Sequence, residues 1–182
     1  MNKKKNNKGF SLIELIIAIA ILIILTGMLA PQFMKYIEKS RVAKDMQTLD
    51  TVYTAVQGAI ADEEAYKDLS KKMASGASLA DLAKKEGLAL TTLMPESPTD
   101  PFSKELYALL GKDAAAINNS FQSGIAKEIP TGNVWVSIDQ NMQVVVTFGS
   151  NANTPATKGN DQLSVGSNAV INATTPSSAT TP

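Results

Sequence analysis

The sequence contains neither cysteine nor histidine among its 182 residues. Without cysteine there are no disulfides, thiolate metal ligands or cysteine nucleophiles. Without histidine there are no imidazole ligands and no catalytic scheme with a histidine base. A phosphate-binding glycine loop is missing as well. Because so little chemistry is left for an active site, we expect a protein that is not an enzyme and that binds no cofactor or metal ion.

The sequence also lacks an excess of basic charge, since 17 basic and 17 acidic residues balance. Four of the basic residues lie before Phe10, and without them the balance is 13 minus 17, or −4. A nucleic-acid-binding protein needs a basic face, so we expect no direct nucleic-acid partner.

The adjacent carboxylates Asp62, Glu63 and Glu64 are neighbours only along the chain, and such a run is typical of a solvated charge cluster.

Charge is nearly absent from Phe10 to Met34, where Glu14 is the only residue with a certain charge. As a helix, these 25 residues extend about 37 Å, enough to span a hydrocarbon layer of roughly 30 Å. A secretory signal is one alternative, but the only Ala-x-Ala within the apolar run, at residues 18–20, lies in its middle. A permanent anchor is another, but it leaves Glu14 unexplained, because an ionisable group at membrane depth costs at least about 2.5 kcal/mol.

The residues from Lys8 to Glu14 read Lys-Gly-Phe-Ser-Leu-Ile-Glu, between a basic leader and an aliphatic run. This pattern resembles the processing motif of type IV prepilins and the related pseudopilins. The resemblance implies that prepilin peptidase cuts between Gly9 and Phe10, leaving 182 minus 9, or 173 residues, and that Phe10 is then N-methylated. It also implies a homo-polymer of pilin subunits, with a platform membrane protein and a cytoplasmic assembly ATPase as further partners.

Glu14 follows Phe10 by one helical turn, the spacing at which side chains approach. Cleavage would create an ammonium group on Phe10, so the carboxylate has two possible cations: the amine of its own chain or that of a neighbouring subunit. From the family resemblance we favour the neighbouring subunit. A misplaced subunit would then leave a carboxylate unpaired in apolar surroundings, which would make Glu14 a register device.

Pro31 is the twenty-second residue counted from Phe10, where many family members have a helix-perturbing proline. Proline removes one backbone donor, and Gly27 weakens the same part of the helix. We therefore predict a bend or an unwound stretch between residues 27 and 33.

Beyond this point the helix is expected to continue, so that it runs from Ser11 to about Ala61. Six apolar residues spaced 4, 3, 4, 3 and 4 apart predict a face that packs on the protein's own core, with a separate partner helix as the alternative. We expect the polar residues between them, including Asp45, to point in other directions. The six are Val42, Met46, Leu49, Tyr53, Val56 and Ile60.

The rest of the chain has weaker signals. A cap at Ser78 predicts a short helix that Gly87 ends, and three prolines predict a loop from Met94 to Pro101. Alternating residues predict an antiparallel hairpin from Val134 to Ile138 and from Met142 to Phe148. A hairpin alone is marginal, so we expect a further strand, with a candidate at residues 169–172.

The expected fold class is α+β, with a long N-terminal α-helix packed on a small antiparallel β-sheet. We divide the chain into a basic leader (1–9, removed), a transmembrane or filament-core helix (10–34), a globular head (35–172) and a disordered Thr/Ser/Pro tail (173–182). Basic residues before Phe10 predict a cytoplasmic N-terminus and an external head. The protein is then a single-pass membrane protein, surrounded by lipid, before it enters an extracellular filament.

The resemblance leaves two functions open. One is a subunit of a type IV pilus-like surface filament, and the other is a pseudopilin of type II secretion or of DNA uptake in competence. Asp100-Pro101-Phe102, with Tyr107 beyond it, partly resembles the Asp-Pro-Trp-Gly-x-x-Tyr segment of the major secretion pseudopilins. Phe102 and Ser103 depart from that pattern, and the tyrosine is displaced by one residue.

Overall fold

The computed structural model describes residues 10–74, 82, 87–139, 141–152, 154–158 and 161–166. The chain divides into two units, one ending at Lys39 and the other beginning at Ser40. We call the second unit the head. One continuous helix, α1, begins in the first unit and ends in the head.

Helix α1 extends from Leu12 to Ala61, which confirms the predicted helix to within one residue at its start. Pro31 is its only interior proline. The helix is unbroken from residue 27 to residue 33, so the unwound stretch is not observed. Proline removes a single donor, and the neighbouring turns keep the helix continuous around it. A bend at Gly27 and Pro31 remains a prediction.

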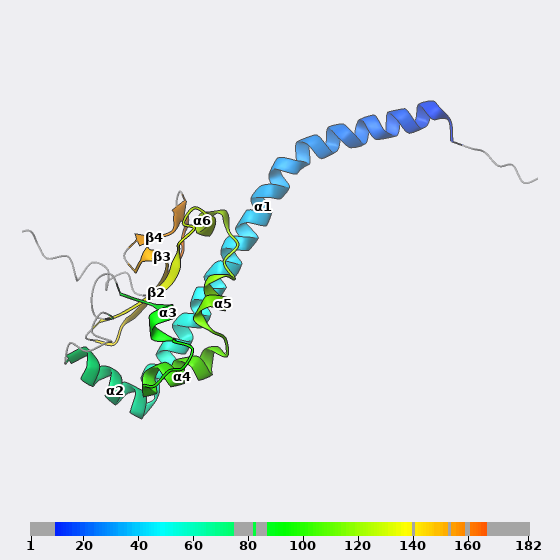
Figure 1. The fold of residues 1–182 in the computed structure, drawn as a ribbon. Helices are drawn as coiled ribbons and strands as arrows, with labels where there is room; N and C mark the ends of the chain where they lie inside the picture. Colours follow the sequence, from blue (N-terminus) through cyan, green and yellow to red (C-terminus); the bar gives the residue numbers. More distant parts are fainter. Residues whose placement is uncertain are drawn as a thin grey trace, which may run out of the picture. The chain divides into compact units, whose positions relative to one another are not determined.

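Five shorter helices follow among the described residues of the head, and the sequence analysis predicted none of them (Figure 1). Four of them, all but α3, begin after a residue whose side chain accepts a backbone hydrogen bond, which is the usual reason that a helix starts at a given residue. The five are α2 (Glu63–Ala74), α3 (Leu90–Leu93), α4 (Pro101–Leu110), α5 (Ala114–Asn118) and α6 (Gly124–Lys127). Helices α2 and α4 lie side by side.

The loop predicted to end at Pro101 is one residue shorter in the structure. It ends at Asp100, because Pro101 is the first residue of α4. Proline is well tolerated there, since an N–H in the first turn has no partner within the helix. Gly111 follows the helix at a φ of 60°, a left-handed conformation that glycine adopts without strain.

The predicted antiparallel hairpin is present at the centre of the head's main sheet. Strand β2 (Asn133–Ile138) pairs with β3 (Val144–Asn151), and Val136 lies opposite Val146. The second strand begins two residues later than predicted. Five shorter strands complete the described part: β1 (Leu88–Ala89), β4 (Thr154–Pro155), β5 (Thr157–Lys158), β6 (Asp161–Gln162) and β7 (Ser164–Gly166). Strand β1 pairs with β2, whereas β4 and β7 both pair with β3. Strands β5 and β6 pair with each other in a separate sheet.

The second half of α1 contributes to the core of the head, as its apolar spacing predicted. Leu49 and Val56 are fully buried, and the other four residues of the face are partly buried against the same core. Val136 of β2 and Val146 of β3 belong to this core as well. The α+β fold class is therefore confirmed.

Asp45 corrects the prediction that the polar residues of α1 point away from the core. It is fully buried, and its carboxylate accepts the N–H groups of Gln122 and Ser123 at 3.0 and 2.9 Å. It follows Val42 by three residues and precedes Leu49 by four, so it lies on the buried face. Its two partners come from a loop about 77 residues away in sequence, which the helical pattern alone does not reveal.

Several predictions fall outside the described residues. They are the helix after Ser78, of which only Leu82 is described, the strand at residues 169–172, the leader and the C-terminal tail. The division of the chain into leader, membrane helix, head and tail therefore stays a prediction.

Candidate functional site

The first turn of α1 holds the Glu14 carboxylate against the backbone of Ser11. The Ser11 N–H donates to Oε2 of Glu14 at 2.9 Å, and the Ser11 carbonyl accepts from the Leu15 N–H at 3.2 Å. A glutamate that reaches back from the third helical position to the N-cap amide is one half of a capping box. The sequence analysis missed this role, although Ser-x-x-Glu is its known signature.

Phe10 directly precedes this turn, and its side chain is 92% exposed. Gly9 lies outside the described residues, so the cut between Gly9 and Phe10 and the methylation of Phe10 remain predictions. In the uncut chain the Phe10 nitrogen is part of a peptide bond and carries no charge. Among the described residues only Ser11 bonds the side chain of Glu14, through Oε2, which leaves Oε1 open to a cation.

The first half of α1 exposes its large apolar side chains in all directions. Many of them, including Ile13, Ile16, Leu22 and Phe33, are between 48% and 75% exposed. Fully burying one such side chain stabilises by about 1.5–3 kcal/mol, so a long exposed series strongly favours apolar surroundings. Among the described helices only α1 is long and apolar enough to cross a membrane, judged by length and composition. This segment therefore favours lipid or other protein around it.

Gly27 and Pro31 lie toward the C-terminal end of this apolar stretch of α1. Apart from the two adjoining residues and the nearby helix backbone, no atom lies within 4 Å of the position that a Cβ would occupy at Gly27, so packing within the single chain does not require glycine there. The absence of a side chain instead leaves space for a neighbouring helix to approach closely.

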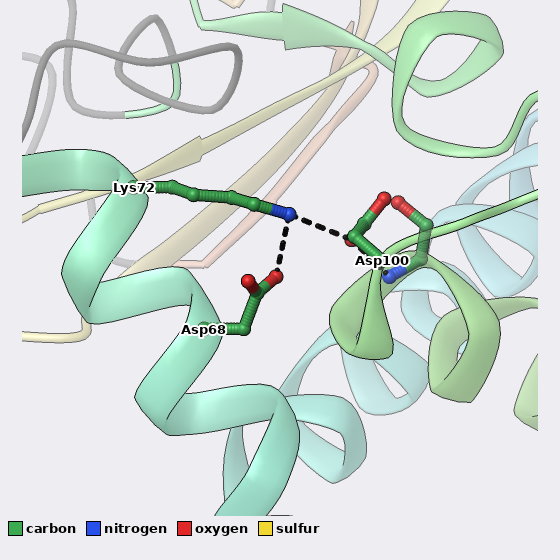
Figure 2. A network of polar contacts seen from close by, with 4 residues as sticks. Asp68, Lys72 and Asp100 are labelled. Carbon is green, nitrogen blue, oxygen red and sulfur yellow. Dashed lines mark hydrogen bonds and ion pairs between the residues drawn. The ribbon is translucent and has the colours of Figure 1, made fainter.

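A polar network in the head connects α2 to the start of α4 (Figure 2). Lys72 Nζ lies 2.7 Å from a carboxylate oxygen of Asp68 and 3.8 Å from one of Asp100. Asp100 also caps α4 by accepting the Ser103 N–H at 2.9 Å. The three charged side chains are only 18–24% exposed, so the network is partly shielded from solvent. The sequence analysis had placed Asp100 only in a loop.

The three adjacent carboxylates make only local contacts or face solvent. Asp62 accepts the Ala65 N–H at 2.9 Å and so caps α2, Glu63 is paired with Lys67, and Glu64 is exposed. The predicted solvated cluster is confirmed. In the described part of the chain, no three Asp or Glu residues are grouped so that they could hold a metal ion.

Residues 4–30 match a family model described as the prokaryotic N-terminal methylation motif. The chain is 38% identical over 65 residues to the type IV major fimbrial protein FimA of Dichelobacter nodosus, which covers 36% of this chain and 42% of the relative. It is 33% identical over 67 residues to the type IV major pilin protein PilA of Myxococcus xanthus, covering 37% of this chain and 30% of the relative.

A third relative is matched over a longer stretch. The chain is 29% identical over 120 residues to a fimbrial protein of Pseudomonas aeruginosa, which covers 62% of this chain and 73% of the relative. The chain thus spans less than half the length of the first two relatives, and no solved structure matches it significantly.

Proposed function

We propose that this chain belongs to the type IV pilin family and is a structural subunit of a type IV pilus-like surface filament. The observation that carries the proposal is the exposed apolar half of α1, most of which lies within the methylation motif matched at residues 4–30. A helix that is apolar all round has to be buried in lipid or in the interior of an assembly. The names of two relatives, a type IV major fimbrial protein and a type IV major pilin protein, support assembly into a filament.

Processing is the first step of the proposed function. Prepilin peptidase cuts between Gly9 and Phe10 and leaves a free amine on Phe10, which is then methylated. The exposed position of Phe10 just ahead of α1 supports access by an enzyme. Before assembly, residues 10–34 cross the membrane, with the N-terminus on the cytoplasmic side and the head outside.

Glu14 then provides the register between subunits. Its Oε2 accepts the Ser11 N–H, while Oε1 is open to the Phe10 amine of a neighbouring subunit. A subunit out of register leaves the carboxylate without a cation in apolar surroundings, which costs several kcal/mol. Transfer from lipid into the filament exchanges lipid contacts for packing against other pilin helices. A platform membrane protein and a cytoplasmic ATPase drive this transfer.

Electron microscopy of cells that lack this chain tests the proposal. We expect long surface filaments on the parent cells, none on the deletion strain, and their return when the gene is supplied again. Filaments that stay abundant and unchanged without the chain would contradict a role as their structural subunit.

The second candidate is a pseudopilin of a secretion or DNA-uptake system, suggested by Asp100-Pro101-Phe102 and Tyr107. In the structure Asp100 caps α4, Phe102 is fully buried and Tyr107 is partly exposed, so the segment has a structural role in the head. The same deletion strain distinguishes the two functions. Intact surface filaments together with defective export or DNA uptake would favour the pseudopilin.

A further inference from the structure

The head contains a groove with a basic rim between α1 and the segment around α5. Its volume is about 310 Å³. Val52 and Ile117 at its base are buried, while Lys44 and Lys112 are exposed at its edge. Neither lysine forms a salt bridge with any described residue. We call this the lysine-rimmed groove, lined by Lys44, Thr48, Thr51, Val52, Leu110, Lys112, Ala116, Ile117 and Ser120.

The same head carries an acidic surface where α1 ends and α4 begins. Asp62, Glu64 and Glu105 line a shallow hollow of about 280 Å³, together with Pro101 and Lys104. Three acids and one lysine give this surface a net charge of −3 + 1, or −2, against +2 for the two lysines of the groove. We call Asp62, Glu64 and Glu105 the acidic corner.

We propose that the lysine-rimmed groove binds the acidic corner of another copy of this chain. The charges are opposite and of equal size, and complementary charges across an interface fix its register and exclude wrong partners. The apolar base of the groove offers buried contact beneath the charged rim. This inference rests on the proposed function, and it adds a contact between heads to the packing of the apolar helices.

The two surfaces of one chain share no lining residue. On α1 the groove takes residues from Lys44 to Val52, whereas the corner starts at Asp62, directly after the helix ends. Each copy therefore carries one groove and one corner at different places. A contact between two unlike surfaces is heterologous, and it continues into an open filament whenever its rotation does not close a ring. The proposed contact thus has the symmetry that a filament requires.

Cross-linking within assembled filaments tests the contact without changing any charge. The chain has no cysteine, so introduced thiols react without background. We would combine Ala116→Cys, which lines the groove, with Ala61→Cys, which adjoins the corner; both positions are exposed. Filaments sheared from cells and treated with a short thiol cross-linker should give a ladder of multimers on a denaturing gel.

The matched control pairs Ala61→Cys with Ser150→Cys, an exposed position on β3, and should give no ladder. Intact filaments without a ladder from the Ala61 and Ala116 pair would overturn the inference. Dimers formed by Ala116→Cys alone would also overturn it, because one groove would then face another. If cells that make the wild-type chain had no filaments containing it, the proposed function itself would be contradicted.

Charge reversal provides the second test. Lys44→Glu with Lys112→Glu should lower the filament yield about tenfold, because like charges would then face each other. Glu64→Lys with Glu105→Lys should lower it similarly, and all four changes together should restore most of it. Reversal of two exposed lysines outside the groove, Lys71→Glu with Lys127→Glu, serves as the control and should have little effect. A full yield from either reversal, or no recovery in the combined variant, would overturn the inference.

Discussion

The backbone N–H of Ser11 donates a hydrogen bond of 2.9 Å to Oε2 of Glu14, across the first turn of α1. This contact gives Glu14 a structural role even in the isolated chain, because it satisfies one of the amides that a helix start leaves unpaired. The proposed pairing with an amine needs a negative charge, whereas the capping contact needs only an acceptor. The two roles of Glu14 can therefore be separated by substitution.

Glu14→Gln tests the role of the charge. Glutamine keeps the capping contact, since both residues serve in a capping box, but it has no charge to pair with the Phe10 amine. We expect normal levels of the chain in the membrane and a filament yield at least about tenfold lower, since a lost charged contact is worth roughly 1.5–3 kcal/mol. Glu14→Asp retains the charge and is the matched control. Filaments as abundant as those of the wild type from Glu14→Gln would show that the charge has no role in assembly.

Gly9→Val tests the processing site. The expected result is that the full 182-residue precursor accumulates in the membrane, because the side chain prevents the close backbone approach that glycine allows at the cut. The filament yield should fall with it, since Phe10 has no free amine in the uncut chain. Lys8→Arg keeps the leader's charge and serves as the control. Immunoblotting of membranes separates precursor from mature chain, and normal maturation of Gly9→Val would place the cut elsewhere.

Asp45→Ala tests the buried carboxylate of the head. The change leaves the N–H groups of Gln122 and Ser123 without their acceptor, and Ser123 is fully buried. We expect the free energy of unfolding to fall by about 2–3 kcal/mol, measured by urea denaturation of the detergent-solubilised chain. Asp50→Ala, on the exposed side of the same helix, should change it by less than about 0.5 kcal/mol. Equal effects of the two substitutions would contradict the account of Asp45.

Asp100 combines two contacts that substitutions can separate. Asp100→Asn keeps an acceptor for the Ser103 N–H but loses the charge that faces Lys72, so we expect a loss of less than about 1 kcal/mol. Asp100→Ala loses both contacts and should cost about 1–2 kcal/mol. The same denaturation measurement checks both values. A loss from Asp100→Asn as large as that from Asp100→Ala would mean that the ion pair, rather than the cap, dominates.

Much of the fold could be predicted because its signals are local. The apolar spacing from Val42 to Ile60 indicated the buried face of α1, and the alternation around Val136 indicated the hairpin. Helix α4 was missed even though Asp100 and Pro101 form a good helix start. Three prolines in this stretch favour a loop, which made the predicted loop one residue too long and obscured the helix start.

Other features could not be predicted because they depend on contacts between distant segments. Asp45 is buried because the loop at Gln122 and Ser123 supplies two N–H groups, and nothing near Asp45 in sequence indicates that loop. In the same way, the link from Lys72 to Asp100 depends on how α2 packs on α4 (Figure 2). The contact of Glu14 with Ser11 is different, because it is local and its Ser-x-x-Glu signature could have predicted it.

The most direct test of the account is mass spectrometry of filaments sheared from the cell surface. We predict that these filaments contain this chain in quantity and that its first residue is Phe10 with a methylated amine, which leaves 173 of the 182 residues. Surface filaments without this chain, or a chain in them that begins at any other residue, would contradict the central claim.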